Sequence, residues 1–351
     1  MTAYPGVFID ESTAPSLSVA TAATAVPIFA AAETHTQFET VRRINSWLEF
    51  TTLEITADSM IYRCIRTYFE NGGGYCYILH PSKFIQEIPK LDDVTLLVAA
   101  GENIQTAVET LCVAGQTLFA ILDAPNLALS TIGTDFSAYG RSEYSALYYP
   151  WLHAEWAKAG ASYLDIPPSA ALAGVYCVVD RERGVWKAAA NVALKGGLRP
   201  TFTVNDVEQN DHQPCNMLRE FQGRGTVVWG ARTLASFDAN TPWRYVPIRR
   251  LVNSIEREIK HTLTCLVFEP NNTVTWQRAC NAINNYLLKL WQQGALLGNT
   301  ESEAYFVQAD KDVTMTDEDI REGKLIVKVG LATTRPAEFM ILELRQQIAQ
   351  N

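Results

Sequence analysis

The sequence predicts an α/β (α+β) fold, in which a mixed sheet core is flanked by helices and followed by a helical C-terminal domain. Short apolar runs alternate with helical patterns over residues 59–123, which is typical of a parallel or mixed sheet covered on both faces. After Thr241-Pro242-Trp243 the pattern changes to two long amphipathic stretches. Both chain ends carry a short strand pattern beside a segment that lacks bulk or contains proline. We therefore expect a two-part body with a short strand near each chain end.

The composition is that of an ordinary globular protein. The 351 residues are 48% apolar and 19% charged, which suits one large or two medium domains. A formal net charge of −9 opposes binding to phosphate backbones, so we expect no nucleic acid partner. No apolar run approaches the length of a membrane span, and the first residues lack the basic and apolar regions of a secretory signal. Seven scattered cysteines without a Cys-x-x-Cys motif indicate buried thiols and synthesis in a reducing cytoplasm.

The first predicted strand is Tyr4–Glu11, in which Val7 and Ile9 face one side and Phe8 faces the other. A connector rich in Ala, Thr and Ser then leads into a second short strand at Val26–Phe29. Because the connector has almost no bulk to pack, we expect it to be extended.

Helices and strands are predicted to alternate through the body of the chain. Ser59 begins a helix with a broad apolar stripe, and Gly72-Gly73-Gly74 ends it by supplying positive φ. The predicted helices are Ser59–Asn71, Asn103–Ala114 and Pro167–Asp180. The predicted strands are Tyr75–Leu79, Val94–Ala100, Thr117–Asp123, Tyr144–Trp151 and Thr226–Trp229. Strands this apolar are expected to be buried on both faces.

Two amphipathic helices are predicted in the C-terminal third. The first, Arg249–Leu263, has apolar residues spaced by four. Its basic residues lie off that stripe, and they are Arg249, Arg250, Arg257 and Lys260. The second begins at Asn272 or Thr273, either of which can cap it, and runs to about Gln293. The acidic stretch Asp310–Glu322 is expected to be a surface loop with one helical turn.

The end of the chain predicts two short strands. In the first, Lys328 points away from a face shared by alternate apolar residues, which are Leu325, Val327, Val329 and Leu331. The second lies within residues 338–344 and carries bulk on both faces. Arg335-Pro336 keeps the linker between them extended. A strand that is apolar on both faces needs a partner on each edge, so the second strand pairs either in an ordinary hairpin of this chain or with another copy.

The sequence lacks the motifs that mark catalysis and cofactor binding. Neither Gly-x-x-x-x-Gly-Lys-Ser/Thr nor Gly-x-Ser-x-Gly occurs, and the five histidines are far apart, so we expect no cofactor, metal or catalytic site. Asp123 ends a buried strand, where open α/β sheets place ligands. The alternative hypothesis is therefore a hydrolase-like α/β enzyme with a site near Asp123. Charges alternate over Asp180–Arg183, which predicts either a solvated ion-pair cluster or a charged contact between subunits.

Several segments resemble contractile tail sheath proteins, in the order of that family and along nearly the whole chain. They are Phe69–Tyr77, Pro167–Tyr176, Asp180, Arg183–Ala188 with Ala190-Asn191, Gly223–Leu234, Trp243–Leu251, Phe268–Asn271 and Pro336–Phe339. No single segment is specific, but together they identify the chain as a member of the family. The length leaves no room for the large outward domains of many phage sheaths. The chain is therefore most similar to the compact sheaths of extracellular contractile injection systems (antifeeding-prophage or virulence-cassette type) or of R-type bacteriocins.

The resemblance implies a structural, non-enzymatic subunit that polymerises helically in stacked, sixfold rings around an inner tube. Contraction of this sheath would drive the tube through a target-cell envelope. The implied partners are further copies of the chain, the inner tube protein, and baseplate and cap proteins, without nucleic acid or direct membrane insertion. The subunit would be made in the bacterial cytoplasm without a signal peptide and would act in a phage tail-like particle released from the cell. A tube or baseplate protein of the same particle is a further alternative, which the helical C-terminal third argues against.

The resemblance also implies roles for particular residues. Strand arms exchanged between subunits would use Val7, Phe8, Ile9, Phe339, Met340, Ile341 and Leu342. The receiving strand would include Leu325, Val327 and Val329. Tube-facing positions would be Arg257, Lys260 and Lys289. The corresponding domains are an arm and connector at 1–25, an α/β core at 26–240, a C-terminal sheath domain at 241–337 and a second arm at 338–351.

Overall fold

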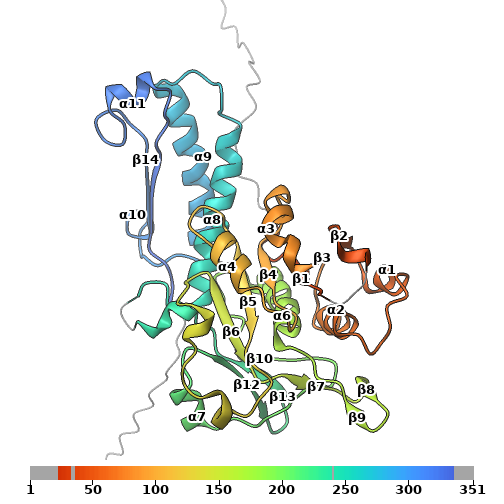
Figure 1. Cartoon of the computed structure of the whole chain (residues 1–351). Coiled ribbons are helices and arrows are strands. Elements are labelled where there is room, and N and C mark those ends of the chain that lie inside the picture. Colours follow the sequence, from red (N-terminus) through yellow and green to blue (C-terminus); the bar gives the residue numbers. More distant parts are fainter. Residues whose placement is uncertain (1–22, 33–35, 239–240, 336–351) are drawn as a thin grey trace, which may run out of the picture. The chain divides into compact units, whose positions relative to one another are not determined.

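The computed structural model describes residues 23–32, 36–238 and 241–335, which Figure 1 draws in colour. The chain forms two compact units, built mainly from Ala22–Arg257 and from Glu258–Ala332, and we call them the core unit and the C-terminal unit. The predicted arm strands, which contain Val7 to Ile9 and Phe339 to Leu342, lie outside the described residues.

A nine-stranded mixed sheet organises the core unit (Figure 1). In sheet order the strands are β10 (Val192–Ala193), β13 (Gly225–Trp229), β12 (Asn216–Phe221), β6 (Ser145–Tyr149), β5 (Phe119–Asp123), β4 (Leu96–Val98), β1 (Pro27–Ala30), β3 (Cys76–Leu79) and β2 (Arg42–Ile44). The strands from β12 to β3 are parallel, and β2, β13 and β10 pair antiparallel with their neighbours. The predicted mixed sheet is thus confirmed.

Helices cover this sheet within the core unit. They are α1 (Trp47–Thr51), α2 (Met60–Glu70), α3 (Phe84–Glu87), α4 (Gln105–Leu111), α5 (Leu129–Ile132), α6 (Pro168–Arg183) and α7 (Asp206–Asp211). Short 3-10 helices lie at Thr36–Phe38, Pro81–Lys83, Ile88–Lys90, Ser137–Tyr139 and Leu234–Phe237. Two small ladders complete the unit: β7 (Leu152–His153) with β11 (Arg199–Pro200), and β8 (Lys158–Ala159) with β9 (Ser162–Tyr163).

Two apolar layers form because successive strand residues point to opposite faces of the sheet. Phe29 and Ile121 belong to one layer, which α2 and α6 cover, while their neighbours Ile28 and Leu122 belong to the other, which α3 and α4 cover. The central strands are buried except at Asp123, the last residue of β5, as the sequence predicts for parallel strands with helices on both faces.

The signals at the ends of α2 act as predicted. The Ser59 hydroxyl accepts a hydrogen bond from the Tyr62 amide, which caps the helix N-terminus, and Gly72 leaves the helix with a φ of 86°. Helix α6 runs to Arg183, three residues beyond its predicted end, and stops at Gly184 with a φ of 90°. Local capping residues thus set these boundaries more firmly than the apolar periodicity does.

Among the residues that the structure describes, the C-terminal unit consists of helices and one small sheet. Helix α8 (Val246–Thr264) begins in the core unit and ends in this one. It is followed by α9 (Thr273–Gln292), α10 (Glu301–Ala304), β14 (Tyr305–Gln308), α11 (Asp317–Arg321) and β15 (Lys328–Leu331). The Asn272 side chain caps α9, as predicted, and α11 is the single helical turn expected in the acidic stretch.

The strand predicted from Leu325 is shorter in the structure, where β15 starts at Lys328. Its partner among the described residues is β14, an element that the sequence analysis did not predict. The ladder ends at the pair Gln308 and Lys328 because Asp310 then begins a turn, in which its carbonyl accepts the Thr314 amide. None of the described helices has the length and hydropathy needed to cross a membrane.

Candidate functional site

An open strand edge lies in the C-terminal unit. Because β14 and β15 form a two-stranded sheet, each has a neighbouring strand on only one edge among the described residues. The half-exposed Phe306 lies against Gly330 of β15, where an added Cβ would stand 2.0 Å from the Phe306 ring. Tyr305 is buried and donates its hydroxyl to Glu301 Oε1 at 2.6 Å. The N–H and C=O groups on the outer edge of such a sheet have no strand to pair with, so the edge is a template for an added strand.

The predicted receiving and tube-facing residues occupy different environments. Val329 lies in β15, whereas Leu325 and Val327 precede the strand. Lys260 and Lys289 are exposed side chains of the C-terminal unit.

Arg257 differs from these two lysines. It belongs to the core unit and is partly buried, and its Nη1 has no hydrogen-bond partner among the described residues.

A buried ion pair joins three distant segments of the core unit. Arg250 on α8 donates to both carboxylate oxygens of Asp180 on α6, at 2.9 and 2.6 Å, and both side chains are about 95% buried. Thr24 donates its hydroxyl to Asp180 at 2.5 Å, and the Thr24 carbonyl accepts from Arg250 at 3.2 Å. The Arg250 guanidinium also lies 4.5 Å from the ring centre of Tyr176. These contacts hold the start of the described chain against α6 and α8.

For Asp180 the prediction of a solvated cluster is wrong, because its carboxylate is buried against Arg250 of the same unit. The next three residues, Arg181–Arg183, are exposed in the single chain, so a charged contact between subunits stays a prediction for them.

Arg249 is the second buried arginine of α8. It pairs with Glu143 at 3.0 Å, donates to Asn253 at 2.8 Å and lies 4.1 Å from the ring centre of Trp243. Arg249 lies off the apolar stripe of α8 because it makes polar contacts inside the core unit, and it is not exposed to water.

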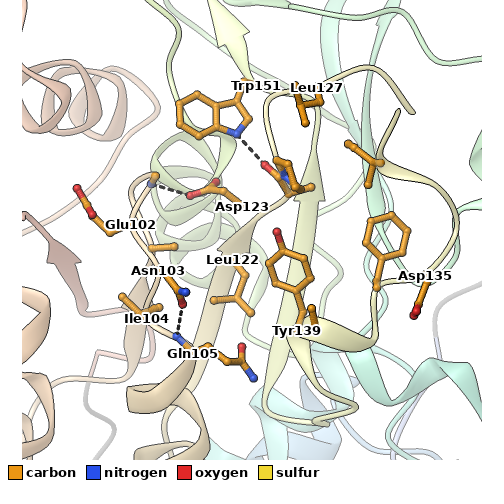
Figure 2. Close-up of a pocket in the computed structure, with 17 residues that line it drawn as sticks. Glu102, Asn103, Ile104, Gln105, Leu122, Asp123, Leu127, Asp135, Tyr139 and Trp151 are labelled. Atoms are coloured by element: carbon orange, nitrogen blue, oxygen red, sulfur yellow. Dashed lines mark hydrogen bonds between the residues drawn. The ribbon is translucent and has the colours of Figure 1, made fainter. Parts of the chain in front are cut away.

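Asp123 lines a cavity of about 520 Å³ at the carboxyl ends of the parallel strands, shown in Figure 2. Its carboxylate accepts hydrogen bonds from the Gly101 amide at 2.9 Å and from the amide and hydroxyl of Ser169, both at 2.7 Å. Ser169 is in the first turn of α6, and Pro167 at the N-cap of that helix provides no side-chain cap. Asp123 thus caps the N-terminus of α6 from a neighbouring strand.

The hydrogen bonds give Asp123 a structural role. The Asp123 oxygens are used by three donors, and the neighbouring Asp135 carboxylate has its pKa lowered mainly by a hydrogen bond from the Ser137 amide. The described residues contain no group of three or more His, Cys, Asp or Glu side chains suited to a metal ion. The geometry therefore gives no support to an enzyme near Asp123.

Asp123 should make the stability of the fold depend on pH. Its removal from water raises its pKa from the ordinary 3.8 to about 6. Because the raised pKa lies above the unfolded value, this group stabilises the fold at low pH, and the contribution is lost as the pH rises through that window. Asp123→Asn should flatten the fall in unfolding free energy between pH 4 and 7, measured by guanidinium denaturation. Asp135→Asn should keep the slope, and an unchanged slope in Asp123→Asn would contradict the assignment.

The sequence analysis missed β14 and the Asp180–Arg250 pair. The run Tyr305-Phe306-Val307 favours a strand and was a usable signal for β14. No local signal pairs two residues 70 positions apart.

Comparison with known proteins places these features in a family. Residues 238–347 match the family model of the phage tail sheath C-terminal domain. A putative prophage major tail sheath protein of Pseudomonas aeruginosa is 24% identical over 252 residues, and the tail sheath protein of Burkholderia phage BcepMu is 26% identical over 208 residues. These alignments cover 69% and 56% of this chain but only 62% and 41% of the curated relatives.

Solved structures match over the whole length. The PVC sheath complex of an extracellular contractile injection system, in its contracted state, is 50% identical with a TM-score of 0.90 and covers 99% of both chains. The contracted helical sheath of the anti-feeding prophage is 39% identical with a TM-score of 0.83, covering 99% of this chain and 100% of that one. A sheath tail protein of Desulfitobacterium hafniense shares the fold, with a TM-score of 0.65 at 10% identity over 94% of this chain and all of that one. These findings confirm the predicted mixed α/β fold and structural, non-enzymatic class, and the chain belongs to the contractile tail sheath family, in the compact form found in extracellular contractile injection systems.

Proposed function

We propose that this chain is the sheath subunit of a contractile injection system, which polymerises helically around an inner tube and contracts to drive the tube through a target-cell envelope. The observation that carries the proposal is the match to the PVC sheath complex at 50% identity over 99% of both chains. The open edges of β14 and β15 supply the chemistry for joining subunits, because a donated strand can satisfy their outer backbone groups.

In this proposal Tyr4–Glu11 and Glu338–Leu344 are the donated arms, and β15 with Val329 is part of the receiving sheet. The proposed domains are the arm and connector at 1–25, the core at 26–240, the C-terminal sheath domain at 241–337 and the arm at 338–351. About six ladder bonds at ~0.5–1.5 kcal/mol each, with burial of the arm's apolar side chains, would bring about 10 kcal/mol per arm before ordering costs. Such tethers could persist while the subunit bodies rotate.

The proposed partners are other copies in stacked sixfold rings, an inner tube, and baseplate and cap proteins. Lys260 and Lys289 are the exposed cations that would face the tube from the C-terminal unit. Contraction would run downhill from a metastable extended lattice, with the energy coming from new contacts between subunit bodies. The subunit would be made in the bacterial cytoplasm and released as part of a phage tail-like particle.

Removing Glu338–Asn351 tests the proposal. We expect a soluble chain with cooperative thermal unfolding that forms no tubes in negative-stain electron micrographs, because the receiving sheet of each neighbour lacks a strand. Removal of only residues 346–351, which follow the predicted strand, is the control and should leave tubes intact. Normal striated tubes from the longer truncation would show that the C-terminal strand is not donated.

A further inference from the structure

Phe268 is an exposed aromatic residue in a strained backbone conformation. It lies between α8 and α9 with a φ of 73°, and its relative exposure is 102%. A bulky residue with positive φ is an outlier, since its Cβ crowds the backbone. The exposed ring recovers none of this cost by packing within its own chain, and strain of this kind gathers at functional positions.

The loop that carries Phe268 is firmly built. Before it, Leu266 is buried; after it, Asn271 donates to the Lys324 carbonyl at 3.0 Å and accepts from Trp276 Nε1 at 2.7 Å. Trp276 is itself buried. The loop therefore fixes the exposed position of the ring before any partner binds. This preorganisation lowers the loss of conformational entropy on binding, as is typical of aromatic anchors at interfaces.

The apolar surface around Phe268 extends beyond one side chain. Val267 and Val274, on either side of the turn, are 56% and 65% exposed. Single exposed apolar residues are common on protein surfaces. Three at one helix–helix turn are more than that, and they indicate a contact surface.

An apolar recess of suitable size lies in the core unit. The cavity at the strand ends, about 520 Å³, is lined by Leu122, Leu127 and Tyr139 (Figure 2), together with Ile132 and Phe136, and Leu127 is half exposed. Three acids also line it, Glu102, Asp123 and Asp135, and the Asp123 carboxylate already caps α6. The apolar part of the lining suits an aromatic ring.

We propose that Phe268 of one subunit seats in the strand-end recess of a neighbouring copy. The inference rests on the proposed function, because it assumes an assembly of this chain. In a helical array, one surface patch of a subunit contacts a different patch of the next subunit. The exposed Phe268 ring and the recess are two such patches on the same chain. Relatives at 50% and 39% identity are sheaths of this kind, the second of them named helical.

Two replacements of Phe268 separate binding from folding. Phe268→Gly removes both the ring and the strain, so its Tm should be no lower than that of the unchanged chain, while its critical concentration for tube assembly should rise about tenfold or more. Phe268→Asp should abolish tubes. Val207→Asp, at a residue of α7 that is 69% exposed, is the matched control and should assemble normally. A purely structural Phe268 would instead lower the Tm in both variants.

A cross-link tests the recess directly. Cys265 is exposed and lies three residues before Phe268, so a flexible bismaleimide should join it to Leu127→Cys of the next copy in assembled tubes. The product should vanish in Cys265→Ser and be absent from Leu48→Cys, where the replaced residue is 77% exposed.

Three outcomes would overturn the proposal: normal tubes from Phe268→Gly, an equal cross-link yield at residue 48, or normal sheaths that lose only their inner tube. The last would assign Phe268 to the tube protein. Failure of the proposed function itself looks different, because the unchanged chain would then form no tubes.

Discussion

Replacing Arg250 by methionine is expected to lower the free energy of unfolding by about 3–5 kcal/mol, because it leaves the Asp180 carboxylate buried without its counter-charge. Methionine fills much of the arginine volume, so the loss would come from the charge and the hydrogen bonds rather than from a cavity. Chemical denaturation at a concentration below tube assembly measures the effect.

Matched variants isolate the ion pair. Arg183→Met, at an exposed position of α6, should change the unfolding free energy by no more than about 0.5 kcal/mol. Replacing both partners, as Arg250→Met with Asp180→Leu, should cost less than the sum of the single changes, because no unpaired charge remains. If the unfolding free-energy changes of the two single variants simply added up in the double variant, the two residues would not be coupled.

The same variants test the end of the N-terminal connector. Asp180 and Arg250 both bind Thr24, so Arg250→Met should speed exchange of the Val26 amide, which donates to Thr95 Oγ1 at 2.8 Å just before β1. The connector is a low-bulk stretch in the sequence, yet this network holds its last residues in place.

Replacing Gly174 by alanine is expected to destabilise the core unit by about 1–3 kcal/mol, and valine should cost more. A Cβ at this position of α6 would stand 2.6 Å from the Tyr68 carbonyl oxygen and 2.9 Å from Asn71 Cβ, both on the α2 side of the crossing. Backbone cannot move aside as a flexible side chain does, so α2 and α6 must separate. Asn71 also accepts the Lys195 amide at 2.9 Å, and that bond would be disturbed.

Gly74→Ala is the matched control, because a Cβ there meets nothing within 4 Å and the backbone is not left-handed. It should be neutral or slightly stabilising, through the lower entropy of the unfolded chain. Thermal unfolding of the two variants side by side gives the comparison. A neutral Gly174→Ala would mean that the two helices are not held at this distance.

The sequence by itself determined the kinds of element, most of their order and the family. Periodicity is a local property, so the apolar run Thr117–Asp123 marks β5, and Asn272 marks the start of α9, without knowledge of the rest of the chain. Boundaries were less accurate, since the predicted helix Asn103–Ala114 is only Gln105–Leu111. The family emerged because many short motifs occur in one order.

Only the tertiary structure decided what the charged residues do. Arg249, Arg250 and Asp180 resemble surface residues in the sequence, because an unpaired charge is too costly to bury. Their burial became favourable only when folding brought partners from 70 and 106 positions away. Asp123 likewise changed from a catalytic candidate to a helix cap once α6 was seen to begin against it. Periodicity acts over a few residues, whereas pairing depends on which distant segments meet, and that information exists only in the folded chain.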